Sequence, residues 1–171
     1  MNPKNKFHIL FVCSGNSCRS PMAEGLLREK LPEHLCDRAM IASAGTLGIE
    51  DMPAAAHAQT VVAERGGNIR DHRSQGLRRR LVAGADLVLA MSSEHVEFLK
   101  ERYPQFLSKV HRLKQFGRKE TLTDGDVEDP IGGDLEAYRE CAGIIDDELE
   151  RILPTLIKMI DEKKPDGSGD E

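Results

Sequence analysis

The sequence predicts an α/β domain built on a parallel β-sheet with helices on both faces. Four strand-like stretches alternate along the chain with segments of helical character, an order that is typical of parallel sheets. Residues 9–12 and 86–91 hold short continuous apolar runs, which indicate strands buried on both faces. A length of 171 residues suits a single domain with a sizeable core.

The first element is a strand that leads through a tight loop into a helix. The apolar run of residues 9–12 ends at Cys13, and Gly15 lies in the polar loop that follows. Ser20 and Pro21 predict the start of a helix, with Ser20 as the N-cap residue and Pro21 in the first helical position. A thiol therefore lies at one end of the loop, and a helix N-terminus lies at the other.

The remaining elements follow from apolar periodicity and from helix-breaking residues. Further strands are predicted at residues 39–45, 86–91 and 109–113, and helices at 21–31, 54–65, 94–103 and 135–160. Pro154 lies inside the last helical pattern and predicts a kink or a break into two helices. We expect one domain over residues 7–162, with flexible ends at 1–6 and 163–171.

Composition and charge exclude several classes of function. The net charge of −5 argues against general affinity for nucleic acid. No apolar run is long enough to cross a membrane, and the first residues lack the apolar core of a signal peptide. The expected location is therefore the cytoplasm. A monomer is favoured, although the sequence leaves the oligomeric state open.

The loop between Cys13 and the helix has the features of an anion-binding site. A helix N-terminus carries unpaired N–H groups and partial positive charge, and a tight loop containing Gly15 can aim further N–H groups at the same point. Arg19 adds a planar fork of donors suited to phosphate. We expect Cys13 in this field to lose its proton below the unperturbed pKa of about 8.5 and to act as a nucleophile.

The cysteines could alternatively form disulfides or a metal site. The four cysteines are Cys13, Cys18, Cys36 and Cys141. They contain no Cys-x-x-Cys pair, and no pair of histidines completes a zinc site. In a chain without an export signal, thiol chemistry is the better prediction. No metal or organic cofactor is implied.

The segment from Cys13 to Pro21, Cys-Ser-Gly-Asn-Ser-Cys-Arg-Ser-Pro, resembles the signature of the low-molecular-weight protein tyrosine phosphatases. That family includes bacterial protein-arginine phosphatases. The resemblance covers residues 7–160 and implies a three-layer domain with a four-stranded sheet. It also implies hydrolysis of phosphorylated proteins through a phosphocysteine intermediate, with Cys13 as nucleophile and Arg19 as phosphate ligand. The other residues of the implied phosphate-binding loop are Ser14, Gly15, Asn16, Ser17, Cys18 and Ser20.

The dipeptide Asp129-Pro130 is the candidate for the acid that such a reaction needs. A carboxylic acid can protonate the leaving oxygen and then activate water in the second step. Proline restricts the residue before it, which would hold Asp129 in a limited geometry. An Asp-Pro pair alone is an ordinary turn, but the resemblance places the family's general acid in such a loop. Asp126 and Glu128 compete by proximity, although neither precedes a proline.

The resemblance also implies supporting residues. It predicts hydrogen bonds that hold the loop among Asn16, Ser20, Ser43 and His72, with Ser20 also bonded to the thiol. For His72 alone, a solvent-exposed residue in a basic run would be the simpler interpretation. The second cysteine, Cys18, is implied as a redox partner that protects the nucleophile, and it would equally serve as a small buried hydrophobic residue.

Two positions bear on the substrate. Tyrosine-specific members usually carry a bulky aliphatic residue where this chain has Ser17, whereas the arginine phosphatases carry threonine, so Ser17 leans toward phosphoarginine. Family members commonly place an aromatic wall after the Asp-Pro pair, and here that position is Ile131. An aliphatic wall weakens aromatic stacking but excludes neither substrate.

Two other functions compete with the phosphatase prediction. Arsenate reductases of the same fold have a similar signature, but they need relay cysteines, and this chain has none between Cys36 and Cys141. A non-catalytic phosphate-binding module would lack the nucleophile or the acid, and both are present. The predicted partners are therefore phosphorylated proteins.

Overall fold

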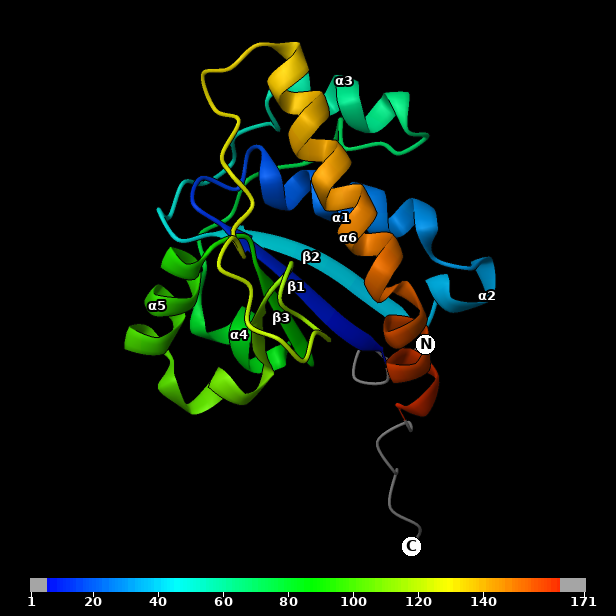
Figure 1. The fold of residues 1–171 in the computed structure, drawn as a ribbon, viewed down its shortest axis with the longest axis vertical. Helices are drawn as coiled ribbons and strands as arrows, with labels where there is room; N and C mark the ends of the chain where they lie inside the picture. Colours follow the sequence, from blue (N-terminus) through cyan, green and yellow to red (C-terminus); the bar gives the residue numbers. More distant parts are fainter. Residues whose placement is uncertain (1–5, 164–171) are drawn as a thin grey trace, which may run out of the picture.

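The computed structural model describes residues 6–163 and contains a four-stranded parallel sheet in the order β2-β1-β3-β4 (Figure 1). The strands are β1 (Phe7–Cys13), β2 (Ala39–Gly45), β3 (Leu87–Ala90) and β4 (Val110–Arg112). All three strand pairs are parallel. The predicted fold class and all four predicted strand positions are confirmed.

Helices cover both faces of the sheet, so the domain has three layers (Figure 1). The helices α1, α3 and α6 share one hydrophobic core with the sheet, and α4, α5 and η2 lie over a smaller core on the other face. The helices are α1 (Arg19–Lys30), α2 (Glu33–Cys36), α3 (Ala56–Glu64), α4 (Arg79–Gly84), α5 (Ser93–Arg102), the 3₁₀ helix η2 (Pro104–Lys109) and α6 (Leu135–Glu162).

Strand β1 joins the two cores because its side chains alternate between the faces. Ile9 and Phe11 pack into the larger core, whereas Leu10 and Val12 pack into the smaller one. All four side chains are buried. Burial of each is worth about 1.5–3 kcal/mol. The apolar run that predicted this strand thus contributes to the hydrophobic cores on both faces of the sheet.

The start of α1 differs from the prediction. The helix begins at Arg19, and Cys18 occupies the N-cap position without a side-chain cap, so Ser20 as N-cap is wrong. The Ser20 hydroxyl instead contacts the sulfur of Cys13 and the amide of Asn16. Pro21 therefore lies at the third helical position. It is tolerated there because the first N–H groups of a helix have no intrahelical partner.

The end of the chain also differs from the prediction at one point. Helix α6 continues through Pro154 as a single helix of 28 residues, so a break there is wrong. Its buried face packs along α1 and α3, and this packing stabilises the helix across the missing backbone donor. The short helices α2 and α4 were not predicted, because four and six residues are too few to give a periodic signal.

The carboxyl end of β1 is where the strand order reverses, with β2 on one side and β3 on the other. Open α/β sheets bind ligands at such points. Cys13 is paired there with Gly45, the last residue of β2. A Cβ atom on Gly45 would lie 2.5 Å from the carbonyl oxygen of Ser14. Glycine at this position therefore allows the loop after Cys13 to pack directly against β2.

The two ends of the described chain lie side by side. The Lys163 ammonium donates to the carbonyl oxygen of Lys6 and to the carboxylate of Asp86. Both lysines belong to the segments that were predicted to be flexible ends, and the rest of those segments, 1–5 and 164–171, lies outside the described residues.

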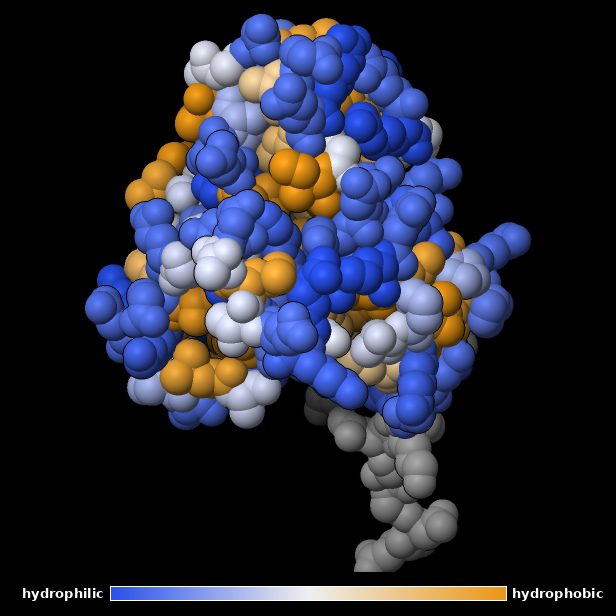
Figure 2. All heavy atoms as spheres, viewed as in Figure 1, coloured by the Kyte–Doolittle hydropathy of each residue, from blue (hydrophilic) through white to orange (hydrophobic). Residues whose placement is uncertain are grey.

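The surface of the domain is mostly hydrophilic. On the face in Figure 2, apolar residues occur in small groups separated by hydrophilic ones. No helix within residues 6–163 combines the length and apolar character needed to span a membrane.

Candidate active site

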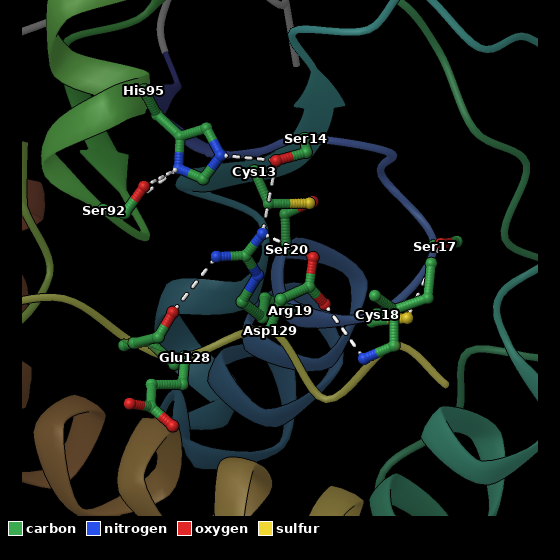
Figure 3. A network of polar contacts seen from close by, with 12 residues as sticks. Cys13, Ser14, Ser17, Cys18, Arg19, Ser20, Ser92, His95, Glu128 and Asp129 are labelled. Atoms are coloured by element: carbon green, nitrogen blue, oxygen red, sulfur yellow. Dashed lines mark hydrogen bonds and ion pairs between the residues drawn. The ribbon is translucent and has the colours of Figure 1, made fainter. Parts of the chain in front are cut away.

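The loop after β1 curls around the sulfur atom of Cys13 (Figure 3). Cys13 is only 2% exposed, and its sulfur lies 2.8 Å from the Ser20 hydroxyl and 3.3 Å from the backbone nitrogen of Asn16. Asn16 has a positive φ of 54°, a left-handed conformation that asparagine tolerates better than most residues. The sulfur is therefore directed into the loop that the sequence predicted as the anion site.

The side chain of Asn16 is fixed by three buried or half-buried hydrogen bonds. Its Oδ1 accepts a hydrogen bond from the backbone N–H of Gln75, so the other amide atom must be the donor. That Nδ2 group donates to the hydroxyls of both Ser20 and Ser43, at 2.9 Å each. Because Ser20 accepts from Asn16, its own proton is available to the sulfur of Cys13.

Ser43 and His72 complete this support. The Ser43 hydroxyl donates to the buried carboxylate of Glu24, which also pairs with Arg28. His72 donates from Nε2 to the backbone carbonyl of Asn16, at 2.8 Å. The structure thus brings together all four residues predicted for the network, and it adds Glu24 and Gln75, which have no local sequence signal.

Arg19 lies across the mouth of the loop and is 5% exposed. Its NH1 group donates to the backbone carbonyl of Val127 at 3.1 Å, and its NH2 group donates to the Ser14 hydroxyl and to Asp129. The Nε atom of Arg19 is the one buried side-chain nitrogen or oxygen in residues 6–163 without a hydrogen-bond partner. A buried, unpaired guanidinium N–H is costly unless an anion accepts from it.

Asp129 is held at the same mouth although it lies 110 positions from Arg19 in sequence. Its Oδ2 is 2.8 Å from NH2 of Arg19, and its Oδ1 accepts from the backbone N–H of Ile131 at 3.2 Å. Its competitor Asp126 is occupied elsewhere, by Arg112 and by the N–H and hydroxyl groups of Ser93. Of the acidic candidates in this loop, Asp129 is the one that contacts Arg19.

Comparison with known proteins decides the family. The family model for low molecular weight phosphotyrosine protein phosphatase matches residues 8–165. The chain belongs to this family. It is therefore a protein phosphatase, and the prediction is confirmed over the arsenate reductase alternative.

The relatives of this phosphatase carry two kinds of name. A protein-arginine-phosphatase of Geobacillus stearothermophilus is 41% identical, over 90% of this chain and 96% of the relative. Among solved structures, the YwlE arginine phosphatase of G. stearothermophilus has a TM-score of 0.81 at 38% identity, covering 94% of this chain and 99% of its own. A low molecular weight protein tyrosine phosphatase of T. tengcongensis has a TM-score of 0.79 at 39% identity, covering 88% and 99%.

Burial disfavours ionisation of the Cys13 thiol, the candidate nucleophile of this phosphatase. Desolvation raises the pKa of the Cys13 thiol, and this outweighs the Ser20 hydrogen bonds, the Arg19 charge and the Asn16 N–H, all of which lower it. The prediction of a lowered thiol pKa is therefore wrong. It took account of the charges and donors around the loop but not of the nearly complete burial of the sulfur.

The Ser20 hydroxyl is the largest of the influences that lower the pKa of Cys13, which gives a testable consequence. We expect Ser20→Ala to raise the thiol pKa further, because the thiolate loses its hydrogen-bond donor. Only the thiolate reacts with iodoacetamide, so alkylation should slow at neutral pH and its pH midpoint should move upward. The pH dependence of alkylation of the two proteins measures this. An unchanged or lower midpoint would contradict the assigned contact.

Two of the other thiols, those of Cys18 and Cys141, lie close to the loop without forming disulfides. All four cysteines are free. The sulfur of Cys18 is 3.2 Å from the Tyr138 hydroxyl and 3.6 Å from that of Ser17, and the sulfur of Cys141 is 3.6 Å from the Glu128 carbonyl. Burial raises the pKa of Cys141 to about 12. The redox role of Cys18 remains a prediction, and the contact with Tyr138 was not predicted.

Two aliphatic residues, Ile131 and Ile49, lie near the loop. Ile131 is 68% exposed and follows the Asp129-Pro130 pair, and its role as a wall of the substrate cleft stays a prediction. Ile49 was not predicted. Its Cδ1 lies 3.9 Å from the position that a Cβ on Gly15 would take, so it borders the loop from the segment after β2.

His95 is the main residue at the site that the sequence analysis missed. It lies on α5, is 1% exposed, and its Nε2 is 2.9 Å from the Ser14 hydroxyl (Figure 3). Burial and the charge of Arg19 lower its pKa to about 4, although the carboxylates of Asp129 and Asp126 act in the opposite direction. The sequence feature that could have identified His95 is the Ser92-x-x-His95 spacing, which is the spacing of a helix capping box.

Proposed function

We propose that this phosphatase hydrolyses phosphoarginine in proteins, with Cys13 as nucleophile, Arg19 as phosphate ligand and Asp129 as general acid and base. The observation that carries the catalytic assignment is the unpaired, buried Nε of Arg19, which lies in the same loop as the sulfur of Cys13. A phosphoryl oxygen would satisfy that donor. Helix α1 begins at this point, and the partial positive charge of its N-terminus also favours a bound anion.

The first step is the transfer of the phosphoryl group to sulfur. Because burial raises the pKa of Cys13, its thiol first loses its proton to solvent. The thiolate then forms a bond to phosphorus while the bond from phosphorus to the leaving nitrogen or oxygen breaks. Asp129 gives its proton to the leaving atom, so that the product departs without a negative charge. Arg19 and the loop N–H groups stabilise the charge on the three remaining phosphoryl oxygens.

The second step releases phosphate and restores the enzyme. Asp129, now ionised, accepts a proton from water, and the water oxygen bonds to phosphorus as the bond to sulfur breaks. Phosphate leaves and Cys13 is a thiolate again. The Ser20 hydroxyl stabilises that leaving thiolate through the same hydrogen bond that it makes to the sulfur in the structure.

Two observations support phosphoarginine as the substrate class. Ser17 carries a small hydroxyl within the loop, 3.6 Å from the sulfur of Cys18, and a small polar side chain there suits a planar, polar guanidinium. The aliphatic residues Ile49 and Ile131 at the mouth provide no aromatic face for a phenyl ring. The relatives named arginine phosphatases are consistent with this choice.

Phosphotyrosine is the second candidate, because a tyrosine phosphatase of known structure is similarly close. A substrate panel separates the two. We expect the wild type to hydrolyse a phosphoarginine protein faster than the same protein carrying phosphotyrosine. Phosphotyrosine turnover faster by about 10-fold or more, a difference of about 1.4 kcal/mol in barrier, would remove the arginine assignment.

The variant Ser17→Ile tests the residue behind the preference. We expect it to shift the ratio of kcat/KM for the two substrates toward phosphotyrosine by about 10-fold, because an aliphatic side chain packs a phenyl ring and cannot hydrogen-bond a guanidinium. Ser17→Thr is the matched control, since it keeps the hydroxyl, and it should leave the ratio nearly unchanged. Equal ratios in all three proteins would contradict the role of this position.

A further inference from the structure

Ser14, Arg19 and His95 form a second set of contacts at the mouth of the loop, separate from the Asn16 network. The Ser14 hydroxyl lies between the imidazole of His95 and the guanidinium of Arg19 (Figure 3). His95 comes from α5, on the opposite side of the sheet from α1. The side chains of Ser14 and His95 have no role in the catalytic assignment above.

The hydrogen-bond directions within this set can be derived. The backbone N–H of Ser92 can only donate, and it is 3.1 Å from Nδ1 of His95. Nδ1 therefore carries no proton, and the Ser92 hydroxyl, 2.9 Å from the same nitrogen, also donates to it. In the neutral ring the proton is on Nε2, which must then donate to the Ser14 hydroxyl 2.9 Å away. The low pKa of His95 agrees with a ring that is neutral at physiological pH.

The same reasoning assigns the proton of Ser14. A hydroxyl oxygen accepts two hydrogen bonds and donates one. Both acceptor positions of Ser14 are used, one by Nε2 of His95 and the other by NH2 of Arg19 at 3.3 Å. The hydroxyl proton must therefore point away from both partners.

We propose that the Ser14 hydroxyl donates a hydrogen bond to the phosphoryl group of the substrate, and that His95 positions it by donating to its oxygen. Ser14 directly follows Cys13 and shares a guanidinium nitrogen with Asp129, so a phosphoryl group on the sulfur lies within its reach. His95 is then a positioning residue that acts through Ser14.

This inference rests on the proposed function but is tested by binding rather than turnover. The probe is inorganic phosphate, and the measurement is its dissociation constant by titration calorimetry. We expect Ser14→Ala to weaken phosphate binding by about 10-fold, the size of one hydrogen bond to a charged group. Binding as tight as in the parent protein would overturn the proposal.

Two matched variants test His95. His95→Met fills the space but carries no donor, and we expect it to weaken phosphate binding about as much as Ser14→Ala. His95→Gln has similar length, can close the capping box with Ser92 and retains an amide donor, so it should bind within about 3-fold of the parent. If Gln weakened binding as much as Met, the positioning role would be wrong.

A double variant separates positioning from general destabilisation. If His95 acts through Ser14, then His95→Met should cause no further loss of phosphate affinity when Ser14 is already alanine. An additional loss in that background would overturn the coupling. His111→Ala removes another partly buried histidine, from β4, and should lower the melting temperature without changing phosphate affinity.

The outcomes also distinguish this inference from the proposed function. A protein that binds phosphate with the expected pattern but hydrolyses neither phosphoarginine nor phosphotyrosine would support the Ser14 donor and contradict the proposed function. Ser14→Ala could instead leave phosphate affinity unchanged and alter only the pH profile of turnover. Ser14 would then influence proton transfer by Asp129 rather than donate a hydrogen bond to phosphate, and the inference would be wrong.

Discussion

Cys13→Ser is expected to abolish turnover while phosphate binding survives. A serine hydroxyl in place of the thiol is far harder to ionise, and serine is a poorer leaving group than a thiolate, so the reaction cycle through position 13 becomes very slow. The donors that hold the anion, Arg19 and the loop N–H groups, do not depend on the sulfur. Steady-state hydrolysis should fall below about one thousandth of the parent rate. Titration with inorganic phosphate should give nearly the parent dissociation constant.

The matched control is Cys36→Ser. Cys36 is exposed at the end of α2 and lies outside the phosphate loop, so its replacement should leave both turnover and binding unchanged. Residual hydrolysis by Cys13→Ser above about one thousandth would contradict the nucleophile assignment. A wild type that binds phosphate but hydrolyses neither phosphoprotein would instead indicate a non-catalytic binding module.

Asp129→Asn is expected to slow hydrolysis by about 100-fold to 10,000-fold for substrates with poor leaving groups. The amide cannot protonate the leaving atom, so the departing group must carry its charge. p-Nitrophenyl phosphate has a leaving group that is stable as an anion, and its hydrolysis should fall much less. Comparing phenyl and p-nitrophenyl phosphate with both proteins gives the dependence on the leaving group.

Glu128→Gln is the control for that experiment, because it removes the neighbouring carboxylate and leaves Asp129 paired with Arg19. It should show the parent dependence on the leaving group. An equal loss for both substrates in Asp129→Asn would mean that Asp129 holds Arg19 in place rather than transferring a proton. The 2.8 Å contact between Asp129 and Arg19 makes this positioning role the alternative to proton transfer.

Much of the fold could be predicted because its signals are local. The buried run in β1, the alternation of strands with helices and the breakers around each element are read directly from neighbouring residues. The phosphate loop is equally local, since Cys13 and Arg19 are six positions apart and the strand and helix on either side hold them. Asp129 could be named because its motif, a carboxylate before proline, is short and the family carries it.

The sequence by itself determined the sheet, the loop between Cys13 and Arg19, and the candidate acid. Tertiary structure alone decided which distant atoms meet: that Arg19 pairs with Asp129, and that His95 reaches Ser14 from another helix. It also decided the direction of the thiol pKa, because desolvation depends on everything packed around the sulfur. Such contacts join segments far apart in the chain, and no periodicity or spacing encodes them.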